Sequence, residues 1–203
     1  MIAIIDYGVG NLFSLKSSFA AIGAEPVVTG EASVIRGAEK LILPGVGAFG
    51  DAAALLRRDG LDQLVCEEAR GGKPLLGICL GMQLLFDYSL EYGRHEGLGL
   101  IPGSVRPIAD YIPAGYKIPH IGWNALRFSG PVSPLFRYVK EGDCVYFVHS
   151  YCGAACEESV IAWAEYGANL TAAVARDNVY GVQFHPEKSG QVGLNILRAF
   201  CEL

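Results

Sequence analysis

KPLLGICLGMQLLF, residues 73–86, predicts a buried strand that turns sharply into a helix. Gly77 and Gly81 flank Cys79 at the turn, so Cys79 occupies the central position of a nucleophile elbow. Such a turn strains the backbone of its central residue and leaves no room for side chains beside it. The two expected elements are a strand at Leu75–Ile78 and a helix at roughly residues 80–88.

The position of Cys79 before a helix has a chemical consequence. The first turn of a helix offers unpaired N–H groups and a positive dipole end, which favour a thiolate and can receive an oxyanion. The elbow therefore singles out Cys79 from the other five cysteines as a candidate nucleophile. Taken alone, the motif equally fits a buried thiol whose neighbouring glycines only serve helix–strand packing.

Short apolar runs alternate with helical patterns in the first half of the chain, as in βαβ units around a parallel sheet. The expected elements are strands at Ile2–Ile5 and Lys40–Leu43, a helix at residues 11–22 ending at Gly23, and a helix at residues 51–70 interrupted at Gly60.

After Gly93, proline and glycine punctuate short strands, which is typical of an antiparallel addition. These strands are expected at Cys144–Val148, Val160–Ala164 and Val179–Phe184, before a final helix with Leu194, Leu197 and Phe200 inward. The expected fold class is α/β, with a mainly parallel central sheet, flanking helices and an antiparallel portion. A single domain over residues 1–203 is expected, since no linker or composition break is visible.

Composition and charge exclude several classes of function. With 51% hydrophobic and 18% charged residues, the chain lies outside the range of disordered proteins. A formal net charge of -5 argues against a nucleic acid or anionic membrane partner. The first residues lack the basic region of a signal peptide, and no stretch approaches the ~20 apolar residues of a membrane span. We therefore expect a cytoplasmic protein with reduced cysteines.

A second motif supplies the groups that a thiol nucleophile needs. VQFHPEKS, residues 182–189, contains His185 as a base and Glu187 as the group that orients it. If Val179–Phe184 is a strand, His185 and Glu187 can point to the same side at its end, because side chains alternate in extended backbone. The triplet His-Pro-Glu together with a Cys elbow is far more specific than either motif alone.

With both motifs in hand, the chain resembles the class I glutamine amidotransferases, whose glutaminase domain is an α/β sheet of about this size. Within that family it is most similar to the glutaminase subunits of imidazole glycerol phosphate synthases. The resemblance covers nearly the full length and rests on seven blocks: DYGVGN (6–11), LPGVGAFG (43–50), GICLGMQLLF (77–86), EGLGLIPGSV (96–105), PHIGWN (119–124), YFVHSY (146–151) and QFHPEKS (183–189).

The resemblance implies a role for each matching residue. Cys79 would attack the amide carbon of glutamine to give a thioester, while His185 moves protons and Glu187 orients it. The backbone N–H groups of Leu80 and Val46 would hold the oxyanion. The residues implied to hold the substrate are Gly45, Gly47, Gln83, Glu91, Ser150 and Tyr151. For Gln83, an exposed helix residue without a function is the competing interpretation.

A partner is also implied, because the chain shows no cofactor site with which to use the ammonia that it would release. The resemblance implies a (β/α)8 barrel cyclase as partner, which forms imidazole glycerol phosphate and AICAR (aminoimidazole carboxamide ribonucleotide) in histidine biosynthesis. Asn11, Trp123 and Lys188 fall in stretches that face the partner in this family. For Trp123, an ordinary half-buried aromatic is an equal alternative. No cofactor and no metal are expected.

Other interpretations of the motifs remain. Residues 45–50 form a GxGxxG, which alone is weak evidence for a dinucleotide site. Cys152, Cys156 and His149 suggest zinc, yet they lack a matched second pair of ligands. A cysteine protease or γ-glutamyl peptidase would use the same triad. The remaining alternatives are a glutaminase subunit of another synthase, for instance one making anthranilate or pyridoxal phosphate, and a non-catalytic regulatory subunit.

Overall fold

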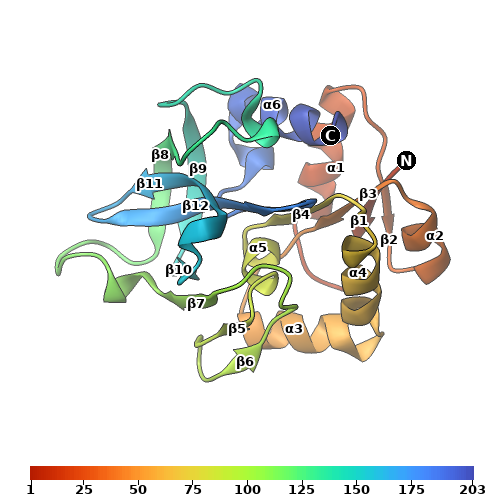
Figure 1. Cartoon of the computed structure of the whole chain (residues 1–203), viewed down its shortest axis with the longest axis horizontal. Helices are drawn as coiled ribbons and strands as arrows, with labels where there is room; N and C mark the ends of the chain where they lie inside the picture. The colour runs from red at the N-terminus through yellow and green to blue at the C-terminus, as the bar shows by residue number, and fades with distance from the viewer.

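The computed structural model describes Met1–Leu203 and is built on a nine-stranded sheet with strand order β2-β1-β3-β4-β13-β12-β11-β8-β9 (Figure 1). The strands from β2 to β13 in this order run parallel, and those from β13 to β9 run antiparallel. The bounds are β1 (Ile2–Ile5), β2 (Val27–Thr29), β3 (Lys40–Leu43), β4 (Leu75–Ile78), β8 (His120–Phe128), β9 (Cys144–His149), β11 (Val160–Glu165), β12 (Asn169–Arg176) and β13 (Val179–Val182).

A second, four-stranded sheet with order β10-β7-β5-β6 lies beside the first. Its strands are β5 (Tyr88–Ser89), β6 (His95–Glu96), β7 (Ser104–Pro107) and β10 (Tyr151–Ala154). The helices are α1 (Leu12–Ala21), α2 (Ala32–Gly37), α3 (Phe49–Arg58), α4 (Leu61–Arg70), α5 (Leu80–Leu84) and α6 (Gly190–Cys201). No helix is long and apolar enough to cross a membrane.

Both faces of the main sheet are buried, because its parallel strands are apolar at successive positions. In β1, Ala3 and Ile5 join one hydrophobic cluster, whereas Ile4 joins another on the opposite face. Helices α1 and α6 cover the face of Ile4, and α3 and α4 cover the other (Figure 1). In α6, Leu197 and Phe200 are fully buried.

The structure confirms most of the expected elements. The strands at Ile2–Ile5, Lys40–Leu43 and Leu75–Ile78 have the predicted bounds. Gly60 separates α3 from α4 with a φ of 70°, a conformation that glycine adopts without strain. The α/β class, with a parallel half and an antiparallel half, is also confirmed.

The helix expected at residues 80–88 is shorter than predicted. It ends at Leu84, and Tyr88–Ser89 forms β5 instead. The carbonyl groups that would continue the helix accept hydrogen bonds from residues 97–101. Gly97 permits this approach, because a Cβ there would lie 2.0 Å from the Phe86 oxygen. A distant segment therefore replaces the helical hydrogen bonds.

The strand expected at Val179–Phe184 ends early, at Val182. The backbone N–H of Gln183 still donates to Ala172, but that of His185 donates to Tyr146 on β9. The chain thus leaves β4 and turns toward the antiparallel half of the sheet. Residues Pro186–Lys188 then form a single 3₁₀ turn before α6.

Candidate active site

Cys79 sits between β4 and α5 in the strained backbone that the elbow motif predicts. Its φ is 54° and its ψ is −113°, a region that residues other than glycine rarely adopt. Its backbone N–H donates to the Val182 oxygen at 2.8 Å, which anchors the turn. A Cβ at Gly81 would lie 1.8 Å from the Leu43 oxygen, and one at Gly77 would lie 2.7 Å from the Gly81 oxygen. Both glycines are therefore sterically required.

The elbow lies at the carboxyl ends of β3, β4 and β13, where α/β sheets place their ligands. Helix α5 has only five residues. Its contribution at Cys79 therefore comes from the local N–H groups of the first turn rather than from a long helix dipole.

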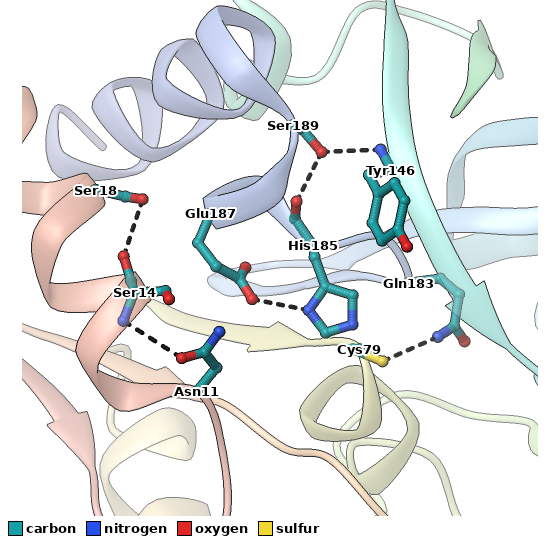
Figure 2. Close-up of polar contacts among 9 residues, drawn as sticks. All are labelled: Asn11, Ser14, Ser18, Cys79, Tyr146, Gln183, His185, Glu187 and Ser189. Atoms are coloured by element: carbon teal, nitrogen blue, oxygen red, sulfur yellow. Dashed lines mark hydrogen bonds and ion pairs between the residues drawn. The ribbon is translucent and has the colours of Figure 1, made fainter. Parts of the chain in front are cut away.

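His185 and Glu187 form the second part of the site (Figure 2). The Nδ1 atom of His185 lies 2.8 Å from Oε1 of Glu187, and each side chain is 4% exposed. Figure 2 shows the other ring nitrogen pointing toward Cys79. The predicted pairing is present, but its expected cause, alternation along an extended strand, is wrong. The 3₁₀ turn that begins at Pro186 brings the two side chains together.

The charges in this pair favour a protonated imidazole. Burial alone would lower the pKa of His185, but its contacts with Cys79 and Glu187 outweigh burial and raise the pKa to about 9. The second carboxylate oxygen, Oε2 of Glu187, is buried without a hydrogen-bond partner. A buried carboxylate with an unpaired oxygen is costly unless a cation compensates it, and the imidazolium supplies that cation.

Ser189 fixes the backbone of His185 and was not predicted. Its Oγ donates to the His185 oxygen at 2.7 Å and accepts from the Tyr146 N–H at 2.9 Å (Figure 2). Ser189 is 1% exposed, so these bonds are shielded from water. The serine that follows His-Pro-Glu-Lys in the sequence is the signal that could have identified it.

The loop after β3 is held at both ends. The Tyr7 hydroxyl donates to the Pro44 oxygen at 2.7 Å, and Glu91 accepts from the Phe49 N–H at 2.7 Å. A Cβ at Gly45 would lie 2.9 Å from the Gly81 nitrogen, so the loop packs directly on the elbow. Val46, between these fixed points, is 43% exposed. No local pattern distinguishes Tyr7 from the other residues of its block.

A cavity of about 310 Å³ opens above the elbow. It brings together most of the predicted site residues, namely Val46, Gly47, Cys79, Leu80, Gln83, Glu91, Ser150, Tyr151, His185 and Lys188. Gly45 and Glu187 are absent from its lining, and so are Asn11 and Trp123. Gln83 is only 5% exposed, which rules out the interpretation of an exposed helix residue.

Comparison with known proteins identifies the family of the chain. The family model of the class I glutamine amidotransferases matches residues 3–202. The chain belongs to this family. The imidazole glycerol phosphate synthase subunit HisH of Oceanobacillus iheyensis is 48% identical over 204 residues, covering 100% of this chain and 99% of the relative. The same subunit of Geobacillus thermodenitrificans is 50% identical over 203 residues, covering 98% and 94%. The family and the similarity expected from the sequence are confirmed.

Solved structures of the family share the fold at low sequence identity. A crystal structure of a glutamine amidotransferase has a TM-score of 0.77 at 20% identity and covers 100% of this chain and 98% of its own. The structure of PurLQS from Thermotoga maritima also has a TM-score of 0.77 at 20% identity, covering 99% and 97%. The class I glutamine amidotransferase fold is thus found over the full chain.

The alternative of a zinc site needs His149 as a ligand, but both of its ring nitrogens already have hydrogen-bond partners. The Nδ1 atom of His149 lies 2.8 Å from the Tyr151 oxygen, and its Nε2 lies 3.0 Å from Nδ1 of His120. Burial lowers the pKa of His149 to about 4, so the ring is neutral. Burial also raises the pKa of Cys152 to about 12 and that of Cys156 to about 11. Both thiols are therefore packing groups near neutral pH.

Of the three predicted partner-facing residues, only Lys188 lines the cavity. Trp123 is 55% exposed, a value that fits both a partner-facing residue and the half-buried aromatic of the alternative interpretation. The rings of Trp123 and Tyr146 pack edge-on with their centroids 6.0 Å apart. The Nζ of Lys188 lies 5.9 Å from the centroid of the Tyr146 ring. Asn11 caps α1 and lies on the Glu187 side of the site in Figure 2.

Proposed function

We propose that the protein hydrolyses L-glutamine to glutamate and ammonia and supplies the ammonia to a synthase of histidine biosynthesis. The observation that carries this proposal is the strained Cys79 elbow facing a histidine whose Nδ1 is held by Glu187. Relatives named as imidazole glycerol phosphate synthase subunits support the choice of synthase. We also propose a cytoplasmic location, because a catalytic thiol persists under reducing conditions.

The geometry supports a two-step mechanism. The Cys79 thiolate attacks the side-chain amide carbon, and the oxygen of the tetrahedral intermediate accepts from the N–H groups of Leu80 and Val46. As the C–N bond breaks, the His185 imidazolium gives its proton to the leaving nitrogen, which departs as ammonia. The neutral His185 then takes a proton from the water that attacks the thioester. Glutamate leaves, and the thiolate and imidazolium are restored.

The remaining lining residues suit the two charged ends of glutamine. The carboxylate of Glu91, 9% exposed, is a partner for the substrate ammonium. The backbone at Ser150 and Tyr151 would receive the substrate carboxylate, and the loop from Gly45 to Gly47 lets the main chain approach the reacting amide. We infer that Gln83 holds the backbone of this carboxylate-binding segment in place, since its amide donates to the Tyr151 oxygen.

The proposed partner is a (β/α)8 barrel cyclase that docks over the mouth of the cavity. Pro119 lines the cavity, and apolar side chains near it in the sequence are exposed, namely Ile118 at 46% before β8 and Ile121 at 58% and Trp123 at 55% within it. Lys188 also lines the cavity. Docking at this point would pass ammonia between active sites before it becomes the non-nucleophilic ammonium ion in water.

We predict that glutamine hydrolysis by the chain alone is slow and rises when the cyclase binds its ligand. An enzyme that released ammonia without an acceptor would waste glutamine. The measurement is glutamate release by the isolated chain, by the complex, and by the complex with the cyclase ligand. Equal rates in all three would contradict coupling, and no stimulation by this cyclase would favour a different synthase as partner.

The change Trp123→Ala is expected to weaken cyclase binding about tenfold to hundredfold, because exposed tryptophans at interfaces often contribute 2 kcal/mol or more. Calorimetric titration of the cyclase into the folded variant measures the effect. Tyr138→Ala is the control, since Tyr138 is 44% exposed but contacts Glu202 at the end of α6. An unchanged dissociation constant for Trp123→Ala would remove this residue from the interface.

A further inference from the structure

Gln183 is a buried polar residue next to the nucleophile that the mechanism above does not use. Its side chain is 0% exposed. The parallel register of β13 and β4 pairs Val182 with Ile78, the last residue of each strand, so Gln183 and Cys79 follow directly after a paired position. The Nε2 atom of Gln183 lies 3.7 Å from the Cys79 sulphur, within hydrogen-bonding reach of a sulphur acceptor (Figure 2).

The orientation of the Gln183 amide is fixed by a chain of contacts. The Tyr151 carbonyl can only accept, so the group of Gln83 that faces it at 3.2 Å is the NH₂. The same NH₂ lies 3.0 Å from the Gln183 amide, which must therefore present its oxygen. A reversed Gln183 would place two NH₂ groups against each other. The Gln183 NH₂ is left facing the sulphur.

A donor held in this way has a clear chemical effect. A thiolate accepts a hydrogen bond more strongly than a thiol, and an N–H bond to an ionised acceptor is about twice as strong as a neutral one. Gln183 is fully buried, so water does not compete for its amide. The donor is also preorganised, since Gln83 and the Tyr151 carbonyl hold it before any substrate arrives.

We propose that Gln183 is a further catalytic residue, whose side-chain N–H donates to the Cys79 sulphur and stabilises the thiolate. Gln83 acts as a positioning residue for it, because its own amide fixes which end of Gln183 faces the sulphur. Tyr151, which lines the substrate cavity, is thereby linked to the nucleophile through two amides. The reaction that the thiolate performs rests on the proposed function, but the donor–sulphur contact does not.

The rate at which iodoacetamide alkylates Cys79 tests this contact without any substrate, since only the thiolate reacts. The full chain is treated between about pH 6 and pH 10, and modification of Cys79 is read by peptide mass spectrometry. Gln183→Glu keeps the shape and the acceptor for Gln83 but places an oxygen against the sulphur. Gln183→Met removes the donor without burying a charge, so it carries the test if Gln183→Glu does not fold.

Near pH 7 we expect both variants to be alkylated about tenfold more slowly than wild type, the loss of one hydrogen bond to an ionised group. The difference between the variants and wild type should narrow as the pH rises, because base then favours the thiolate with or without the hydrogen bond. Gln191→Glu on α6 is the control, because Gln191 is exposed and its side chain donates to Asn195, away from the active site. It should leave the profile unchanged.

Folded Gln183 variants with the wild-type alkylation profile would overturn the proposal and leave Gln183 as a packing residue. A purely structural role would instead lower the thermal stability without changing the pH dependence. Failure of the proposed function is distinguishable: the alkylation profile would shift in the variants, while wild type with its cyclase would leave glutamine intact.

Discussion

Replacing Cys79 with alanine is expected to lower glutamine hydrolysis at least about 10⁴-fold, because loss of a catalytic nucleophile in such triads costs 10⁴ to 10⁶. The fold should persist. Alanine removes only the sulphur from a side chain that is 8% exposed, and the backbone bond from Cys79 to Val182 is kept. The measurement is glutamate release in the presence of the cyclase and its ligand.

Two controls separate loss of chemistry from loss of assembly. The complex that contains Cys79→Ala should still make product from added ammonium salt at the wild-type rate, since only ammonia release is removed. Cys144→Ala changes an exposed cysteine and should leave hydrolysis unchanged. If Cys79→Ala hydrolyses glutamine within tenfold of wild type, the triad is not the catalyst. If neither wild type nor Cys79→Ala hydrolyses glutamine, the protein is the non-catalytic subunit of the alternative interpretation.

The sequence predicted those parts of the site that depend on local pattern. The elbow at Cys79 follows from an apolar strand, two glycines and the start of a helix within a few residues. The β1, β3 and β4 strands were found at their true bounds because buried parallel strands are continuous apolar runs. His185 and Glu187 were also paired correctly.

What the sequence missed depends on contacts between distant segments. The early end of α5 is caused by N–H groups from residues 97–101, which no pattern within residues 80–88 reveals. Gln183 becomes important only through the register of β13 against β4. Tyr7 donates to a backbone oxygen 37 residues away, and Ser189 accepts from a backbone N–H 43 residues away. Local patterns do not reveal which distant groups such residues contact.

Glu187→Gln is expected to lower kcat for glutamine hydrolysis about 10³- to 10⁴-fold, as loss of the orienting carboxylate does in comparable triads. The amide can occupy the same space beside His185, but it cannot stabilise the imidazolium that protonates the leaving nitrogen. Glutamate release by the complex measures the loss. Glu158→Gln changes an exposed carboxylate and is the matched control.

The same variant changes the titration of His185 in a direction that can be measured. The folded pKa of about 9 lies above the ordinary 6.5, so the folded state binds more protons than the unfolded state between these pH values. The stabilisation is therefore complete below about pH 6.5 and is lost as the pH rises through about 9. Glu187→Gln removes one cause of the raised pKa, while burial still lowers it. Urea unfolding at several pH values should therefore show that the free energy of unfolding declines less with rising pH in the variant than in wild type. NMR titration should give a lower pKa for His185 in the variant. A variant that keeps both the wild-type decline and the wild-type kcat would show that Glu187 neither charges nor orients the histidine.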